Sequence, residues 1–288
     1  MISGKVGLLG ATSLAGEALI SLLQGGGAQV HAFSRKPQPS GSDGLVWHRL
    51  SVADRSQSNL IEHWLCAAPV WVLHEHFTVL EACGARRVVV LSSTSRFTKK
   101  ESPDRAEKAL AARLIEGEES LKAWATSKEV EWAILRPTLM YGLGRDKNIT
   151  EIIRFIRRFG FFPLLGKAGG LRQPVHVQDV AAACIAALES PAGVNRAYNI
   201  SGEETVPYYE MVSRVFAALH RSPRLLTIPF AVFGITVACL RLLPRYRHWS
   251  VAMAERMNSD LVFDHSDAAR NLGFSPRPFR LSREDLPR

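Results

Sequence analysis

The chain has 288 residues, of which 47% are hydrophobic and 22% are charged, so it can bury a sizeable core and is not an intrinsically disordered chain. Its four cysteines occur singly, without a Cys-x-x-Cys pair, which argues against a disulfide framework or a zinc site and favours a reducing, cytoplasmic location. The formal net charge is +9, but the excess is concentrated late in the chain, and we expect no nucleic-acid partner.

Strand and helix patterns alternate along the first half of the chain. Residues 5–9 form a short apolar strand, residues 17–24 have apolar side chains at helical spacing, and residues 29–34 form a second strand. Further strands are predicted at residues 70–73, 88–91 and 132–135. Strands that alternate with helices indicate an α/β fold, a doubly wound parallel sheet covered by helices on both faces.

Helical patterns dominate after residue 137. Helices are predicted over residues 148–159, where Asn148 and Glu151 have capping-box spacing, over residues 180–188, with Asp179 as the N-cap, and over residues 209–219. We expect a nucleotide-binding domain over residues 1–170 and a smaller substrate lobe over residues 171–288. Residues 174–177 are predicted to form a strand that returns to the first domain.

A turn of small residues joins the first strand to the first helix. Small side chains at such a turn let the backbone approach a pyrophosphate, while the N-terminus of the helix faces the phosphates. The placement between strand and helix makes this glycine pattern more specific than the pattern alone. The predicted cofactor contacts in this turn are Gly10, Thr12, Ser13, Leu14 and Gly16.

Five sequence blocks occur in an order that is typical of one superfamily. They are residues 10–16, Val88-Val-Val-Leu-Ser-Ser-Thr94, Leu135-Arg-Pro-Thr-Leu-Met-Tyr-Gly142, Pro174-Val-His-Val-Gln-Asp-Val180 and Tyr198-Asn-Ile-Ser-Gly202. The chain therefore resembles an extended or atypical short-chain dehydrogenase/reductase of the nucleoside-diphosphate-sugar epimerase-like kind. The resemblance implies a Rossmann-type domain, a nicotinamide dinucleotide and a small-molecule substrate that is phosphate- or nucleotide-linked.

The second strand ends in Ser34, Arg35 and Lys36 without an acidic residue. A site that prefers NAD places a carboxylate there for the ribose 2′-hydroxyl, whereas an arginine offers a bidentate fork to a 2′-phosphate. NADP is therefore the predicted cofactor and NAD the second choice; the alternative is a solvated basic turn. The resemblance adds further cofactor contacts at Ser51, Val52, Leu73, Ser92, Ser93 and Pro137.

The chain departs from the family at two positions that carry function. Ser13 replaces the middle glycine of the turn; a serine fits if its φ is negative, and its hydroxyl would add a phosphate contact. No lysine has a tyrosine four residues before it, so the family's Tyr-x-x-x-Lys pair is absent, and Leu110 and Leu114 stand at its positions. The resemblance then leaves Thr94 and Tyr141 as candidate catalytic residues and Arg172 as a candidate substrate contact.

Three functions remain open on the sequence. The first is an NADP(H)-dependent oxidoreductase or epimerase-like enzyme of atypical mechanism, and the second is a catalytically silent dinucleotide-binding sensor or scaffold. The third is a membrane-surface enzyme or assembly factor, suggested by the apolar and basic residues 225–248. That stretch is too short and too interrupted to span a bilayer, so it is predicted to lie on a membrane surface, inside the small lobe or in a homodimer interface.

Overall fold

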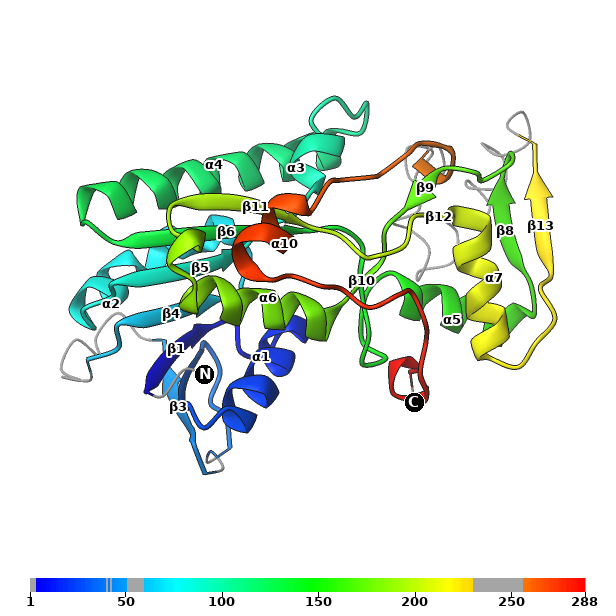
Figure 1. The fold of residues 1–288 in the computed structure, drawn as a ribbon. Helices are drawn as coiled ribbons and strands as arrows, with labels where there is room; N and C mark the ends of the chain where they lie inside the picture. The colour runs from blue at the N-terminus through cyan, green and yellow to red at the C-terminus, as the bar shows by residue number, and fades with distance from the viewer. Residues whose placement is uncertain (1–3, 40, 42, 51–59, 230–255, 288) are drawn as a thin grey trace.

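The computed structural model describes residues 4–39, 41, 43–50, 60–229 and 256–287 (Figure 1). Its centre is a seven-stranded sheet with the order β11-β6-β5-β4-β1-β2-β3, and all neighbouring strands are parallel. The strands are β1 (Lys5–Leu9), β2 (Gln29–Ser34), β3 (Leu45–Arg49), β4 (His63–Cys66), β5 (Arg87–Leu91), β6 (Glu131–Pro137) and β11 (Arg196–Ile200).

Helices cover both faces of this sheet (Figure 1). On one face, α1 (Leu14–Gly25) and α6 (Val177–Glu189) share a hydrophobic core with α10 (Ser266–Leu272). On the other face, η1 (Val70–His76), α2 (Phe77–Ala82) and α4 (Arg105–Ser127) contribute to a second core. The doubly wound parallel sheet predicted from the sequence is confirmed.

The fourth strand differs from the prediction. It is His63–Cys66, paired with β1 and β5, whereas Val70 to Leu73 lie in the 3-10 helix η1. Both segments are short and apolar, so periodicity alone does not separate them. Pro69, which has no backbone N–H to contribute to a sheet, marks the start of η1, while the side chain of Trp64 packs directly over Gly7 of the central strand.

A third hydrophobic core builds the small lobe. It contains α5 (Ile149–Phe159), α7 (Tyr208–Ala218) and the parallel pair β8 (Phe162–Leu165) and β13 (Leu225–Ile228). Two further strand pairs lie between the lobes, β7 (Met140–Tyr141) with β10 (Val175–His176) and β9 (Leu171–Arg172) with β12 (Val206–Pro207). The short elements are α3 (Ser95–Thr98), η2 (Pro191–Gly193), η4 (Arg256–Asn258) and η5 (Arg283–Asp285).

The predicted boundary between residues 170 and 171 does not separate the two lobes. Helix α5 and strand β8, which precede it, belong to the core of the small lobe. Helices α6 and α10 and strand β11, which follow it, pack on the large sheet. The chain returns to the first lobe near Val175, as predicted, although β10 pairs with β7 and not with the large sheet.

Two helix caps differ from those predicted. The N-cap of α6 is His176, whose imidazole accepts a hydrogen bond from the backbone N–H of Gln178. Asp179 instead binds Arg277 through its carboxylate. At α5, the carboxylate of Asp146 accepts hydrogen bonds from the backbone N–H groups of Asn148 and Thr150. It thereby takes the place of the capping box predicted at Asn148. In both places a neighbouring residue competes successfully for the orphan N–H groups of the first turn.

Of residues 225–248, only the segment up to residue 229 is described, and the remainder lies outside the described residues. Leu225 to Ile228 form strand β13 at the edge of the small lobe. Among the described residues, no helix is both long and apolar enough to cross a membrane.

Candidate cofactor and substrate site

The turn between β1 and α1 is packed so closely that it admits only glycine at two positions. Gly10 has a φ of +76°, and a Cβ there would lie 2.3 Å from the backbone nitrogen of Ala68. A Cβ on Gly16 would lie 2.3 Å from the carbonyl oxygen of Gly10. The turn therefore presents bare backbone at the carboxyl edge of the sheet, beside the loop that follows β4.

Ser13 is the N-cap of α1 in the structure. Its φ is −78°, the negative value that a serine in place of glycine requires. Its hydroxyl accepts a hydrogen bond from Gly16 N at 3.0 Å and donates its proton to the carbonyl of Ala67 at 3.2 Å. Because that proton is used within the protein, the hydroxyl cannot donate to a phosphate in this arrangement. The N–H groups of Leu14 and Ala15, in the first turn, have no intrahelical acceptor.

The basic turn after β2 is open to solvent. Ser34 accepts hydrogen bonds from the backbone of Lys36 at 3.2 Å and from the side chain of Gln38 at 3.3 Å, which fixes the turn. Arg35 and Lys36 are exposed. Burial lowers the pKa of His76; the charge of Glu75 acts against this, and the positive charge of Arg35 lowers the pKa further. Ser51 and Val52 lie outside the described residues.

Leu73 was expected to contact the cofactor because it was placed at the end of the fourth strand, and this expectation is wrong. Leu73 is only 1% exposed and packs in the core between η1 and α4. The residues that follow β4 at the carboxyl edge are Ala67, Ala68 and Pro69. This pair of small residues lies against the glycine turn, since a Cβ on Gly10 would lie 2.6 Å from the carbonyl carbon of Ala67.

Hydrogen bonds join the segment after β5 to the end of β6. Thr94 is buried, and its hydroxyl donates to the carbonyl of Pro137 at 3.2 Å, as does its backbone N–H. The hydroxyl of Ser93 accepts from Ser95 N at 3.1 Å. The hydroxyl of Ser92 points the other way and donates to Glu118 at 2.5 Å. The hydroxyl proton of Thr94 is thus engaged by the backbone.

Leu110 and Leu114, which were predicted to stand at the tyrosine and lysine positions of the family that the chain resembles, are packing residues. Leu114 is 4% exposed and lies in the core with η1 and the ends of the central strands. Leu110 is half-buried against the same core. One turn further along α4, a Cβ on Gly117 would lie 2.8 Å from the backbone nitrogen of Trp71, so α4 approaches η1 closely. This face of α4 offers no proton-transfer group at either position.

Glu118 is a site residue that sequence reasoning missed. It is fully buried on α4, and its carboxylate binds Ser92, Arg96 and Arg136. Arg136 approaches it with Nε at 3.1 Å and with Nη2 at 2.5 Å. The sequence did contain a signal for it, because Glu118 is an acidic residue four positions after Leu114, on the buried face of an amphipathic helix.

Tyr141 lies in the core of the small lobe and not at the carboxyl edge of the sheet. Its hydroxyl donates to the carbonyl of Arg280 at 3.3 Å, and its ring makes edge contacts with His176 and Phe279. Burial raises the pKa of Tyr141 to about 12. A fully buried phenol with its proton on a backbone carbonyl is a packing group, so the catalytic role expected for it has no support in the structure.

Arg172 is 4% exposed, and its donors are used by backbone carbonyls of the chain. It donates to Leu171 O at 2.7 Å and to Ser259 O at 2.8 Å, and it also binds the carbonyl of Arg256. Its guanidinium lies 5.4 Å from the centroid of the Tyr208 ring, and burial lowers its pKa to about 10. Arg172 therefore holds the segment at residues 256–259 against the small lobe.

That segment carries an ion pair between the lobes. Arg256 binds the carboxylate of Glu107 on α4, and Lys99 Nζ lies 3.7 Å from the same carboxylate. The hydroxyl of Ser102 also donates to Glu107 at 2.8 Å. Burial is the largest effect on Lys99 and lowers its pKa. Basic side chains from both lobes thus converge on one acidic group.

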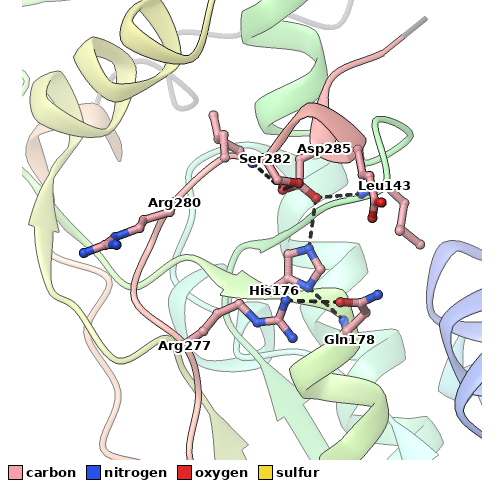
Figure 2. A pocket seen from close by; sticks show the side chains of 9 residues that line it. Leu143, His176, Gln178, Arg277, Arg280, Ser282 and Asp285 are labelled. Atoms are coloured by element: carbon pink, nitrogen blue, oxygen red, sulfur yellow. Dashed lines mark hydrogen bonds and ion pairs between the residues drawn. The ribbon is translucent and has the colours of Figure 1, made fainter.

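A pocket of about 270 Å³ lies beneath the C-terminal segment, and no residue of the glycine turn lines it. Figure 2 shows His176 and Asp285 facing each other in it, with Ser282 beside Asp285. His176 accepts the N–H of Gln178 on Nδ1, so its proton lies on Nε2 and is donated to Asp285 at 3.0 Å. Neither group is free to act as a base. Among the described residues, no three metal-ligating side chains converge.

Comparisons with known proteins show which proteins this chain resembles. Residues 72–201 match the family model described as the NAD dependent epimerase/dehydratase family. The chain is 30% identical over 119 residues to NADH dehydrogenase [ubiquinone] 1 alpha subcomplex subunit 9, mitochondrial, of Arabidopsis thaliana, covering 39% of this chain and 29% of that protein. It is 24% identical over 161 residues to UDP-glucose 4-epimerase of Vibrio cholerae, covering 56% and 47%. The chain thus spans half or less of the length of the curated relatives it matches.

Solved structures share the fold over nearly the whole chain. MoeE5 in complex with UDP-glucose and NAD superposes with a TM-score of 0.69 at 22% identity, covering 96% of this chain and 94% of that one. UDP-glucuronic acid 4-epimerase from Bacillus cereus in complex with NAD superposes with a TM-score of 0.71 at 14% identity, covering 98% and 93%. At this level of identity the likeness establishes the fold.

Proposed function

We propose that this chain binds NADP(H) at the carboxyl edge of its parallel sheet. The match to the NAD dependent epimerase/dehydratase family model and the shared fold both support this proposal. One observation carries the proposal. The Gly10–Gly16 turn has no room for a side chain at either glycine and leads directly into the N-terminus of α1. A pyrophosphate needs this combination of bare backbone and helix N-terminus.

Named residues would hold each part of the dinucleotide. The N–H groups of Leu14 and Ala15 would bind the pyrophosphate, and Ser93 and Pro137 would border the nicotinamide end. Arg35 and Lys36 would bind a ribose 2′-phosphate, because an arginine fork matches a phosphate and no carboxylate follows β2. When bound, the nicotinamide would supply hydride chemistry, and this chain's residues would bind, orient and exclude water.

Turnover at this site would be atypical. Leu110 and Leu114 cannot transfer protons. The Thr94 hydroxyl could orient a substrate oxygen only if it gave up its hydrogen bond to the Pro137 carbonyl and donated to the substrate instead. The substrate we propose is a small, phosphate- or nucleotide-linked molecule. Lys99 and Arg256 would bind its anionic part at the lobe junction, with Arg172 holding Arg256 in place through the backbone.

The experiment is a direct one on the whole chain. Calorimetric titration with NADPH and NADH is expected to show saturable binding, tighter for NADPH, and extraction of the purified protein is expected to yield the same nucleotide. Hydride exchange is then assayed with nucleotide sugars such as UDP-glucose. No binding of either dinucleotide at millimolar concentration would contradict the proposal.

A second candidate is a dinucleotide-binding protein without turnover, a sensor or a scaffold. The observation that favours it is the state of the hydroxyls at the site, since those of Ser13, Ser92 and Thr94 all donate to groups of the protein itself. One relative is by name a subunit of an NADH dehydrogenase. Measurable hydride exchange in the assay above would exclude this candidate.

A further inference from the structure

One fully buried carboxylate and two largely buried guanidinium groups form an ionic cluster whose charges do not balance. Arg96 of α3, Glu118 of α4 and Arg136 of β6 are 15%, 0% and 13% exposed in their side chains, and both arginines bind the one carboxylate. Two guanidinium groups and one carboxylate leave a net charge of +1. An uncompensated charge away from water is costly, so a buried cluster of this kind calls for a further anion.

Among the described residues, neither arginine forms an ion pair with an acidic side chain other than Glu118. The hydrogen bond from Lys122 lowers the pKa of Glu119, and the positive charges of Arg96 and Arg136 lower it further. Its carboxylate is 57% exposed and forms an ion pair with Lys122 at 2.9 Å. That pair is neutral in itself.

One hydrogen-bond donor of the cluster is also unsatisfied. The Nε of Arg96 is buried and has no hydrogen-bond acceptor among the residues that the structure describes. Orphaned donors of this kind are rare in folded proteins. The ring of Phe97 lies 5.2 Å from the guanidinium of Arg96 and 5.3 Å from that of Arg136, which screens the cations from water but accepts no hydrogen bond from Nε.

The cluster adjoins the proposed cofactor site. Ser92, the first residue after β5, donates to Glu118, and Glu118 lies one helical turn beyond Leu114 on α4. A lysine at position 114 is what the family resemblance leads one to expect. Arg96 brings a cation to this same region from a different element.

We propose that the Arg96 cluster binds an oxyanion, a carboxylate or a phosphate group, through the guanidinium of Arg96, whose Nε has no acceptor among the described residues. The guanidinium fork matches the two oxygens of either group, and the oxyanion would both accept the Nε proton and cancel the excess charge. This proposal goes beyond dinucleotide binding, because the anion would bind to residues that do not belong to the Gly10–Gly16 turn.

The test uses inorganic phosphate and acetate as probes on the full chain. Thermal unfolding and calorimetric titration are performed in a zwitterionic buffer of low salt, with Arg96→Gln, Arg96→Lys and the control Arg154→Gln. Arg154 is a 46% exposed arginine paired with Glu151 on α5, so its replacement removes the same charge far from the cluster. The two probes distinguish a phosphate from a carboxylate ligand.

We expect one of the two anions to raise the melting temperature of the wild type saturably, with affinity reduced at least tenfold in Arg96→Gln and unchanged in Arg154→Gln. Without the anion, Arg96→Gln is expected to melt no lower than the wild type, because it removes the uncompensated charge. Arg96→Lys keeps the charge, so it is expected to retain part of the affinity and serves if the glutamine variant does not fold.

Two results would overturn the inference. One is a wild type whose melting temperature and heat signal respond to neither anion, and the other is an equal response in Arg96→Gln. Dinucleotide binding is tested separately. Arg96→Gln is expected to leave the NADPH affinity unchanged. Arg35→Ala is expected to lower the NADPH affinity and to leave the response to the anion intact.

Discussion

The imidazole of His176 donates from Nε2 to a carboxylate oxygen of Asp285, 109 positions later in the chain, over 3.0 Å. The same oxygen accepts the backbone N–H of Leu143 at 3.1 Å, and the other oxygen accepts the backbone and hydroxyl protons of Ser282 at 2.8 Å each. One carboxylate thus ties the C-terminal segment to the start of α6 and to the loop after β7 (Figure 2).

This contact makes the stability of the fold depend on acid pH. Burial by itself would raise the pKa of Asp285, but the hydrogen bonds from His176 and Ser282 outweigh it and hold the pKa at about 2, below the ordinary value of about 3.9. A carboxyl with a depressed pKa in the folded state contributes stability above its unfolded pKa and loses it as the pH falls through the folded value. The free energy of unfolding should therefore fall between about pH 4 and pH 2.

Asp285→Asn tests this relationship. It is expected to lower the free energy of unfolding by about 1–3 kcal/mol at neutral pH, the cost of weakening hydrogen bonds to a buried charge, and to flatten the acid dependence. Urea denaturation at several pH values measures both effects. The control is Asp267→Asn, which changes a 72% exposed carboxylate paired with Arg270; an equal loss in both variants would contradict the assignment.

Arg35 is predicted to select the cofactor. Arg35→Ala should weaken NADPH binding by about 1–3 kcal/mol, the scale of a charge-assisted contact, and leave NADH nearly unchanged. Calorimetric titration provides both values. Arg86→Ala is the matched control, because Arg86 is 78% exposed and precedes β5, at the opposite edge of the sheet. Equal wild-type affinities for the two dinucleotides would exclude the assignment.

Epimerisation of UDP-glucose is predicted to be undetectable or very slow. The absence of a positioned proton-transfer group commonly costs about 10²–10⁴-fold in rate, and Leu110 and Leu114 occupy both positions. Chromatography of the nucleotide sugars after prolonged incubation measures the rate. A robust rate that survives Thr94→Ala would contradict this prediction. It would mean that other residues than those implied by the family resemblance carry out the chemistry.

Ser13 is predicted to stabilise the chain as a helix cap. Ser13→Ala should lower the free energy of unfolding by about 0.5–2 kcal/mol, whereas Ser13→Gly, which restores the family's glycine, should lower it by only a few tenths. The reason is that alanine leaves the N–H of Gly16 without its acceptor, while glycine lets water or a phosphate reach it. Equal losses in the two variants, measured by denaturant unfolding, would argue against a capping role.

The lobe boundary shows what local patterns leave open. Residues 148–159 were recognised as a helix from isoleucines on one side and arginines on the other, and α5 begins and ends within a residue of that prediction. Which core those isoleucines enter depends on β8 and α7, the latter more than 50 residues away. Periodicity reports that a face is buried, and it carries no information about the partner that buries it.

The sequence by itself determined the parallel sheet, the glycine turn, the basic end of β2 and the loss of the tyrosine–lysine pair, because each rests on residues that are neighbours in the chain. Only the tertiary structure decided that 63–66 and not 70–73 is the fourth strand, that Tyr141 is a core residue, and that Arg172 is bound by backbone carbonyls. It alone brought Arg96, Glu118 and Arg136 together. Burial and ion pairing are properties of groups that meet in space, and in this chain those groups come from separate elements, so no local pattern contains them.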